Sequence, residues 1–128
     1  MGKKVLVLYG GKSKEREVSL RSGRAVADAL SQKGFEVSVL DLNENSVASI
    51  VADRPDVAFI ALHGKYGEDG TVQGLLDILE IPYVGSDVLT SAVCINKATT
   101  KKILAYEQLP TAPFVILNTE RGPKIGLA

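Results

Sequence analysis

Two stretches of this sequence carry residue types that could bind and activate a small molecule. The first is "GGKSKEREVS", in which Glu15 and Glu17 flank Arg16 shortly after a pair of glycines. The second is "ALHGKYGEDGTVQG", which holds His63, the one histidine among 128 residues, followed by three spaced glycines. A carboxylate can pair with a ligand ammonium, and an imidazole can donate a hydrogen bond to a carboxylate or a developing oxyanion. The two stretches therefore predict one small-molecule site, provided that the fold brings them together.

The elements around these stretches alternate between strand and helix patterns. Apolar runs and alternating residues predict strands at about 3–9, 35–42, 56–63 and 81–86, with a further extended segment at 113–117. Helical spacing predicts helices at about 17–33, 45–52, 72–79, 86–94 and 96–108. This order is typical of an α/β fold with three layers, in which an open, mostly parallel sheet has helices on both faces and right-handed crossovers. Ligands of such folds bind beyond the carboxyl ends of the strands, where both stretches are expected to lie.

Several finer features follow from the same patterns. The strand at 35–42 alternates apolar and polar residues, which places it near the sheet edge, whereas the strand that ends at His63 is apolar throughout and central. The amphipathic pattern of the first helix rests on small or apolar residues at spacings of three and four: Val18, Ser22, Ala25, Val26, Ala29 and Leu30. Asp69 or Thr71, Ser86 and Asn96 are the expected N-caps of the later helices.

The sequence predicts a substrate-binding domain over residues 1–95 and a linking helix with the start of another domain over 96–128. The tail after Leu117, "NTERGPKIGLA", carries turn residues, and no closing helix or strand is expected in it. This tail suggests that the sequence is part of a longer protein.

Composition excludes several function classes. The 15 Lys and Arg residues balance the 15 Asp and Glu residues, so no bulk field attracts nucleic acid or an anionic membrane. No apolar run approaches the roughly 18 residues of a membrane span. The single Cys94 and the lack of an N-terminal export pattern indicate a cytoplasmic protein. A lone histidine without a cysteine partner argues against a metal site.

Each candidate residue also has an ordinary structural explanation. Acids at a helix start are stabilised by the helix dipole by about 0.3–1 kcal/mol, which alone could account for Glu15 or Glu17. His63 could be a hydrogen-bonded structural residue. Glu68 and Asp69 are expected to hold the loop that sets His63 rather than to bind ligand. Lys97 could belong to a solvated basic face or could contact a nucleotide phosphate.

The glycines of the first stretch do not form a nucleotide-binding fingerprint. Gly10 and Gly11 are adjacent, and both the third glycine of G-x-G-x-x-G and the spaced glycine of a P-loop are missing. Asp41, at the end of the second strand, could still grip a ribose, so a Rossmann-type oxidoreductase remains a minor alternative.

Three motifs together resemble the N-terminal part of D-alanine–D-alanine ligase, an ATP-grasp enzyme. They are "GGKSKEREVSLRSG", "ALHGKYGEDGTVQGLLDILEIPYVGSD", and "NKATTKKIL" before "LPTAPF", and the resemblance covers residues 3–117. It implies a Rossmann-like pre-ATP-grasp domain, use of ATP with Mg²⁺ or Mn²⁺, a homodimer, and synthesis of the D-Ala-D-Ala dipeptide for peptidoglycan. ATP would phosphorylate the carboxylate of the first D-alanine, and the amine of the second would then displace phosphate.

The resemblance also implies roles for individual residues. Glu15 would bind the ammonium of the first D-alanine, Val18 would line the site near its methyl group, and His63 would stabilise the activated carboxylate. Lys97 would contact nucleotide phosphate. The positions that complete the ATP and metal sites in the family have no counterpart in this sequence, so the chain alone is expected to be inactive. The alternative is a non-catalytic module that dimerises and binds an amino acid.

Overall fold

The computed structural model describes residues 2–118 and 122–125 of the 128-residue chain. Their contacts group the chain into two compact units, Met1–Ala92 and Val93–Ala128, and α4 (Val88–Ile95) crosses the boundary between them. The domain boundary expected at residue 95 stays a prediction. Each unit is described by itself.

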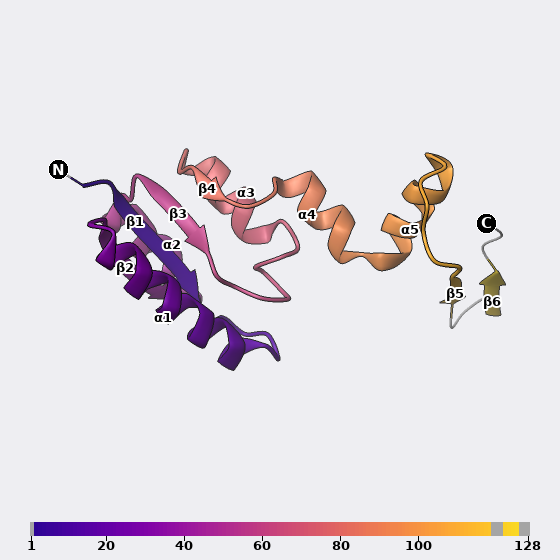
Figure 1. The fold of residues 1–128 in the computed structure, drawn as a ribbon, viewed down its shortest axis with the longest axis horizontal. Coiled ribbons are helices and arrows are strands. Elements are labelled where there is room, and N and C mark those ends of the chain that lie inside the picture. The colour runs from indigo at the N-terminus through magenta and orange to yellow at the C-terminus, as the bar shows by residue number, and fades with distance from the viewer. Residues whose placement is uncertain (1, 119–121, 126–128) are drawn as a thin grey trace. The chain divides into compact units, whose positions relative to one another are not determined.

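The first unit is built on a parallel sheet of four strands in the order β2-β1-β3-β4 (Figure 1). The strands are β1 (Lys4–Tyr9), β2 (Glu36–Asp41), β3 (Val57–Ile60) and β4 (Tyr83–Val84). The helices between them are α1 (Arg16–Gln32), α2 (Ser46–Asp53) and α3 (Thr71–Ile78). Because β2 lies at an edge and β3 lies inside the sheet, the positions inferred from their hydrophobic patterns are confirmed.

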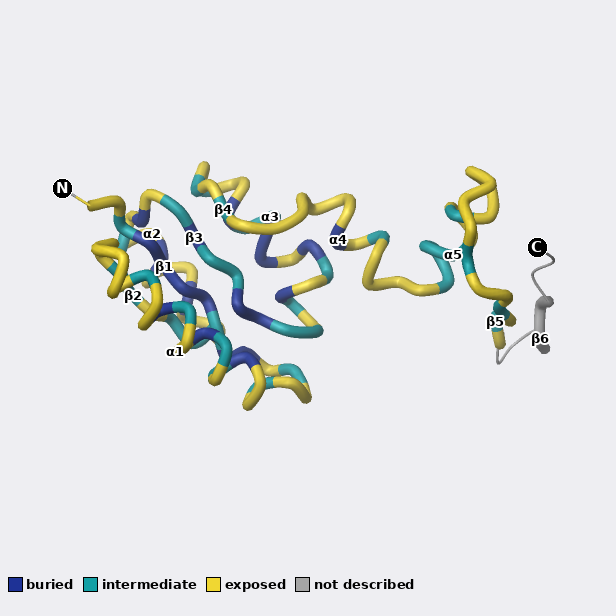
Figure 2. The backbone as a smooth tube through the Cα atoms, viewed as in Figure 1, coloured by how far each residue is buried: buried dark blue, intermediate teal, exposed yellow. Residues whose placement is uncertain are grey.

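Two apolar clusters cover the two faces of this sheet. The larger cluster packs α2 and α3 against the sheet, with Leu8, Ile50 and Leu76 fully buried at its centre. The smaller cluster packs α1 on the opposite face, where Val7 of β1 contacts Ala27 and Ala61. Figure 2 shows the buried residues concentrated along β1 and the end of β3. The expected three-layer α/β architecture is therefore confirmed.

The buried face of α1 is narrower than the face predicted from the residue spacing, and it lies at a different angle around the helix. Its buried residues are Ser19, Gly23 and Ala27, whereas Val18 is 46% exposed. A Cβ atom added to Gly23 would lie 2.5 Å from Cβ of Tyr9, so only glycine permits this approach of α1 to β1. Small residues four apart form the contact because α1 lies directly on β1. The apolar pattern alone could not reveal this close approach.

The ends of β3, α3 and α4 differ from expectation, and the N-cap of α3 is Gly70 rather than Asp69 or Thr71. β3 ends at Ile60, three residues before His63, although the Ala61 N–H still donates to the Leu8 carbonyl at 2.8 Å. At the start of α4, the Thr90 N–H donates to Asp87 Oδ1 at 2.8 Å, so Asp87 takes the capping role expected of Ser86. The Asp87 carboxylate thus reaches the first turn of α4. Ser86 contributes only its carbonyl, which accepts from the Ser91 hydroxyl.

The second unit contains α5 (Lys97–Tyr106), β5 (Val115–Asn118) and β6 (Gly122–Ile125). Asn96 caps α5 as predicted, since its Oδ1 accepts from the Thr99 N–H at 3.0 Å. The expectation that the tail after Leu117 forms no strand is wrong, because β6 pairs with β5 in an antiparallel ladder. Its sequence, GPKI, carries little strand propensity of its own, and pairing with β5 decides its conformation.

Among the described residues, no helix has the length and apolar content needed to cross a membrane.

Candidate functional site

The site begins where β1 and β3 end side by side. The two strands pair in parallel, with Leu8 opposite Ile60, so the loops that follow them leave the sheet at the same edge. The Ser19 hydroxyl then links both loops, because it accepts from the Gly10 N–H at 2.8 Å and donates to the Ala61 carbonyl at 2.7 Å. Ser19 is fully buried. Sequence reasoning missed this residue, whose only signal was a polar side chain on the sheet-facing side of a helix.

An ion pair fastens the first loop to the end of β2. The Arg16 guanidinium donates to both carboxylate oxygens of Asp41, and the Gly11 N–H donates to Asp41 Oδ1 at 3.1 Å. The Arg16 hydrogen bonds, with that of Gly11, hold the pKa of Asp41 below its usual value despite the opposing effect of burial. A Cβ atom on Gly10, whose φ is +73°, would lie 2.2 Å from Asp41 Oδ1, so this closure requires glycine.

The same ion pair weighs against the oxidoreductase alternative. A ribose-binding acid must offer its oxygens to the two hydroxyls of the sugar. Both oxygens of Asp41 already accept hydrogen bonds from Arg16. Asp41 therefore acts as an anchor for the loop between β1 and α1.

Glu15 stands at the N-cap position of α1, where the loop becomes helix. Its N–H donates to the Ser13 hydroxyl at 3.1 Å, and among the described residues its side chain makes no capping hydrogen bond to α1. The carboxylate instead faces the second loop, since a Cβ atom added to Gly64 would lie 3.1 Å from Glu15 Oε2. Glu15 is exposed, so its carboxylate can reach a ligand.

Two acids hold the second loop, as expected from the sequence. Glu68 Oε2 accepts from the Gly64 N–H at 2.7 Å, and Asp69 accepts from the Tyr66 N–H at 2.9 Å and the Thr71 N–H at 3.0 Å. Burial acts to raise the pKa of Asp69, but the Tyr66 and Thr71 hydrogen bonds outweigh it, so that pKa lies below its usual value. The loop is therefore closed by charge-assisted bonds to its own backbone.

A buried glutamine completes this loop. Gln73 of α3 is only 4% exposed, and its Nε2 donates to the Gly67 carbonyl at 2.8 Å. A Cβ atom on Gly67 would lie 2.4 Å from Cβ of Leu62, so the loop packs tightly against the end of the strand segment. The Gln73 Oε1 atom has no hydrogen-bond partner among the residues that the structure describes. In the sequence, Gln73 belongs to the H-G-x-x-G-E-D-G-x-x-Q-G pattern, in which roles are expected only for the histidine and the acids.

His63 lies between the two loops and is one-third exposed. Its Nε2 is 3.3 Å from the Ser22 hydroxyl of α1, and its Nδ1 is 3.9 Å from Glu68 Oε1. Gly64, the next residue, is the one that faces the Glu15 carboxylate. The structure thus brings Glu15 and His63 to one edge of the sheet, with the Glu15 carboxylate beside Gly64, the residue that follows His63.

The other two predicted residues are less closely tied to Glu15 and His63. Val18 lies on the exposed side of α1, one turn beyond Glu15. Lys97 is the first residue of α5, is exposed, and belongs to the second unit. The neighbouring Lys101 is held within that unit, since its ammonium donates to the Thr111 hydroxyl and to the Ala112 carbonyl.

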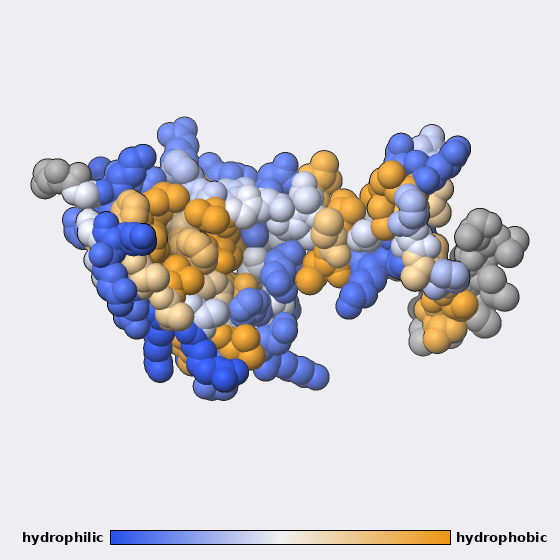
Figure 3. All heavy atoms as spheres, in the orientation of Figure 1, coloured by the Kyte–Doolittle hydropathy of each residue, from blue (hydrophilic) through white to orange (hydrophobic). Residues whose placement is uncertain are grey.

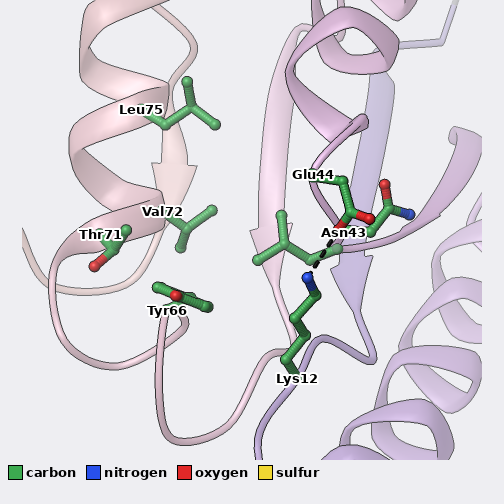
Figure 4. Close-up of a pocket in the computed structure, with 8 residues that line it drawn as sticks. Lys12, Asn43, Glu44, Tyr66, Thr71, Val72 and Leu75 are labelled. Atoms are coloured by element: carbon green, nitrogen blue, oxygen red, sulfur yellow. Dashed lines mark hydrogen bonds and ion pairs between the residues drawn. The ribbon is translucent and has the colours of Figure 1, made fainter.

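A separate pocket of about 280 Å³ lies beside this site (Figure 4). Leu42, Val72 and Leu75 supply apolar walls, and the ring of Tyr66 also lines the pocket. The Lys12 ammonium at the pocket is paired with Glu44 at 2.8 Å, which raises the pKa of Lys12 and lowers that of Glu44. This pocket therefore offers an apolar surface and a neutralised ion pair, unlike the carboxylate and imidazole of Glu15 and His63.

Within the described ranges, no cluster of three or more His, Cys, Asp or Glu side chains could hold a metal ion. Asp41 is bound to Arg16, and Glu68 and Asp69 are bound to backbone N–H groups. Glu15 has no side-chain partner in the part of the chain that the structure describes. These residues do not fit a magnesium site. The chemistry that they can perform is the binding of an ammonium by Glu15 and hydrogen bonding or charge stabilisation by His63.

Comparison with known proteins finds a matching family model and similar proteins. Residues 4–49 and 43–86 match the family model described as the D-ala D-ala ligase N-terminus. The D-alanine–D-alanine ligase of Pelotomaculum thermopropionicum is 53% identical over 124 residues, which are 97% of this chain and 39% of that protein. That of Aquifex aeolicus is 57% identical over 124 residues, covering 91% of this chain and 43% of the relative.

Solved structures agree with the sequence relatives. The crystal structure of the Bacillus anthracis D-alanine–D-alanine ligase complexed with ATP aligns with a TM-score of 0.80 at 41% identity. The alignment covers 94% of this chain and 43% of that structure. The chain thus spans about two fifths of the length of these proteins, and it corresponds to their N-terminal part.

Proposed function

The chain belongs to the D-alanine–D-alanine ligase family, and we propose that it forms the first-substrate part of an enzyme that joins two D-alanine molecules using ATP. The observation that carries this proposal is the placement of Glu15 and His63 at one edge of the sheet. The Glu15 carboxylate faces Gly64, and His63 immediately precedes that glycine. An acid and an imidazole in this arrangement suit an amino acid, whose ammonium and carboxylate need opposite partners.

In the proposed reaction, Glu15 binds the ammonium of the first D-alanine and so fixes the orientation of its carboxylate. Val18, on the same face of α1 and 46% exposed, supplies an apolar contact for the methyl group. The carboxylate oxygen takes the γ-phosphoryl group of ATP, ADP leaves, and the amine of the second D-alanine then displaces phosphate to form the peptide bond. His63 stabilises the negative charge of the activated carboxylate through its N–H group.

ATP is assigned to this function on two supports. One is the ATP complex of the Bacillus anthracis relative, and the other is Lys97 at the start of α5, whose exposed ammonium can contact a phosphate as a point charge. Mg²⁺ or Mn²⁺ belongs to the proposal only through the family, where it would neutralise charge on the phosphates. Synthesis of the dipeptide for peptidoglycan follows from the same family relationship.

We also propose a cytoplasmic homodimer. An exposed free cysteine, Cys94, suits a reducing compartment. Apolar atoms gather at the surface of α4 in Figure 3, where Leu89 is 73% exposed and Val88 and Ile95 are also exposed. An exposed apolar surface of this kind is typical of a protein interface. Light scattering on the chain tests this part, and a monomer at high concentration would contradict it.

The activity is tested with a chimera in which the rest of the Aquifex aeolicus ligase completes this chain. Phosphate release and dipeptide formation with ATP and D-alanine are expected from the chimera, whereas the 128-residue chain alone should release no phosphate. A folded chimera without dipeptide synthesis would contradict the proposed function.

The role of Glu15 is tested in the same chimera by Glu15→Gln, with the exposed neighbour Glu17→Gln as the matched control. Loss of the charged partner of the ammonium should raise the KM for the first D-alanine by roughly 10- to 100-fold, the range of a lost charge-assisted hydrogen bond. Glu17→Gln should leave KM unchanged. His63→Ala should lower kcat more than it changes KM, and an effect confined to the KM for ATP would show that His63 does not serve the carboxylate.

A further inference from the structure

We propose that Ser22 is a positioning residue for His63, because its hydroxyl oxygen accepts the Nε2–H hydrogen bond and so keeps the ring proton on Nε2. The inference starts from the place of Ser22 on α1. It lies seven residues, or two helical turns, after Glu15, so both side chains project from the same side of α1 toward the second loop. The His63 Nε2 atom lies 3.3 Å from the Ser22 oxygen.

The direction of this hydrogen bond follows from the single proton of a hydroxyl group. The Ser22 hydroxyl has two helix carbonyls within reach, that of Val18 at 3.0 Å and that of Ser19 at 3.2 Å. Carbonyl oxygens can only accept, and a Ser22 proton directed to the helix backbone is common for serine within helices. The lone pairs of the oxygen then remain for His63, and in the proposed arrangement Nε2 is the donor.

The other side of the ring agrees with this assignment. The nearest carboxylate oxygen to Nδ1 is Glu68 Oε1 at 3.9 Å, which is beyond hydrogen-bond distance, whereas the 3.3 Å between Nε2 and the Ser22 oxygen is a long hydrogen bond. The second oxygen of Glu68 is already bound to the Gly64 N–H at 2.7 Å. A proton on Nδ1 of the neutral ring would therefore gain no hydrogen bond from the residues that the structure describes, whereas a proton on Nε2 gains the Ser22 oxygen.

The consequence for the reaction rests on the proposed function. With the proton held on Nε2, the ring carries a prepared donor next to Gly64, which the Glu15 carboxylate faces. At 3.3 Å the bond to Ser22 is long, so an incoming carboxylate oxygen can share or replace it without a change of tautomer. Ser22 thus prepares the donor that His63 is proposed to offer, without touching the substrate itself.

Nuclear magnetic resonance can test this directly, because His63 is the single histidine of the chain. Long-range proton–nitrogen correlation of the ¹⁵N-labelled 128-residue protein, at a pH where the ring is neutral, should show the Nε2–H tautomer, and the exchange rate of the Nε2–H proton gives the reference for the variants. Ser22→Ala should add a fraction of the Nδ1–H tautomer and speed exchange of that proton by roughly 10-fold, as a donor with a protein acceptor becomes open to water. Ser22→Thr, which keeps the hydroxyl, should behave as wild type.

The control is Ser31→Ala, an exposed serine on the same helix, which should change nothing at His63. An unchanged backbone spectrum would establish that Ser22→Ala is folded. The proposal is overturned if the wild-type ring carries its proton on Nδ1, or if Ser22→Ala leaves tautomer and exchange unaltered.

A kinetic arm separates this inference from the proposed function. In the chimera, Ser22→Ala should lower kcat by roughly 10-fold, as expected for a misoriented donor, with the KM for ATP unchanged. If the chimera with native Ser22 makes no dipeptide, the proposed function fails, while the tautomer measured in the 128-residue chain still decides the inference.

Discussion

The two units of the chain differ in how they hold their side chains. The first unit closes apolar clusters on both faces of its sheet, and Leu8, Ile50 and Leu76 are fully buried there. In α5 of the second unit no residue is buried, and apolar side chains such as Tyr106, at 84% exposure, lie open. A packed core fixes atoms to within the tolerance that a binding site needs, because its side chains interdigitate with few alternatives. Glu15 and His63 stand on such a core, whereas Lys97 stands on a helix that has none of its own.

The largest effect is expected from a cavity created by mutation in the core of the first unit. Leu8→Ala should lower the free energy of unfolding by about 3–5 kcal/mol, because a fully buried leucine leaves a cavity that its neighbours cannot fill. The matched control is Leu117→Ala in β5, where the side chain is 77% exposed and the loss should stay within about 0.5 kcal/mol. Urea unfolding followed by circular dichroism measures both, and similar losses would remove the contrast between the units.

A polar substitution tests whether the core also fixes the site. Ser19→Ala should lower the free energy of unfolding by about 2–4 kcal/mol, since it leaves the Gly10 N–H and the Ala61 carbonyl without their partner. Hydrogen exchange should rise in both loops, and Ser31→Ala on the same helix is the control. A loss confined to one loop would mean that Ser19 does not join them.

Helix capping provides a direct comparison between the units. Asn96→Ala should weaken α5 by about 1 kcal/mol, because the Asn96 side chain accepts from the Thr99 N–H. The control is Asn45→Ala at the N-cap of α2, where the side chain makes no capping hydrogen bond within the described part of the chain. Hydrogen exchange should rise over residues 97–106 in the first variant alone. Faster exchange of the first unit in Asn96→Ala would show that its stability depends on α5.

The smallest effect is expected from the ion pair of the first loop, because Arg16 and Asp41 are both more than one-third exposed. Since the pKa of Asp41 is lowered in the folded state, the pair stabilises the fold above the unfolded pKa of about 3.9, and the contribution is lost as the pH falls through the folded value. Asp41→Asn should therefore reduce stability at neutral pH and flatten the acid limb. Parallel pH profiles of variant and wild type, measured by urea unfolding, would contradict this role.

Local sequence was sufficient to predict the layers of the first unit and the two stretches of the site. Hydrophobic periods of two and 3.6 residues identify strands and helices, and the ends of parallel strands meet at one edge whatever the details of packing. Glu15 and His63 were therefore expected at the same edge, and Glu68 and Asp69 were expected to bind their own loop. These contacts join residues close in sequence or fixed by strand order.

The tertiary structure alone decided which side chains hold those residues in place. Ser19 joins Gly10 to Ala61, Arg16 joins Asp41, and Ser22 meets His63 across 41 residues. It also decided that β6 forms a strand, because its partner rather than its composition supplies the hydrogen bonds. The local sequence around a serine or an arginine is the same whether its side chain faces water or a distant backbone group. Only the close approach of α1 to the sheet, set by small residues packed on β1, determines which partner it meets.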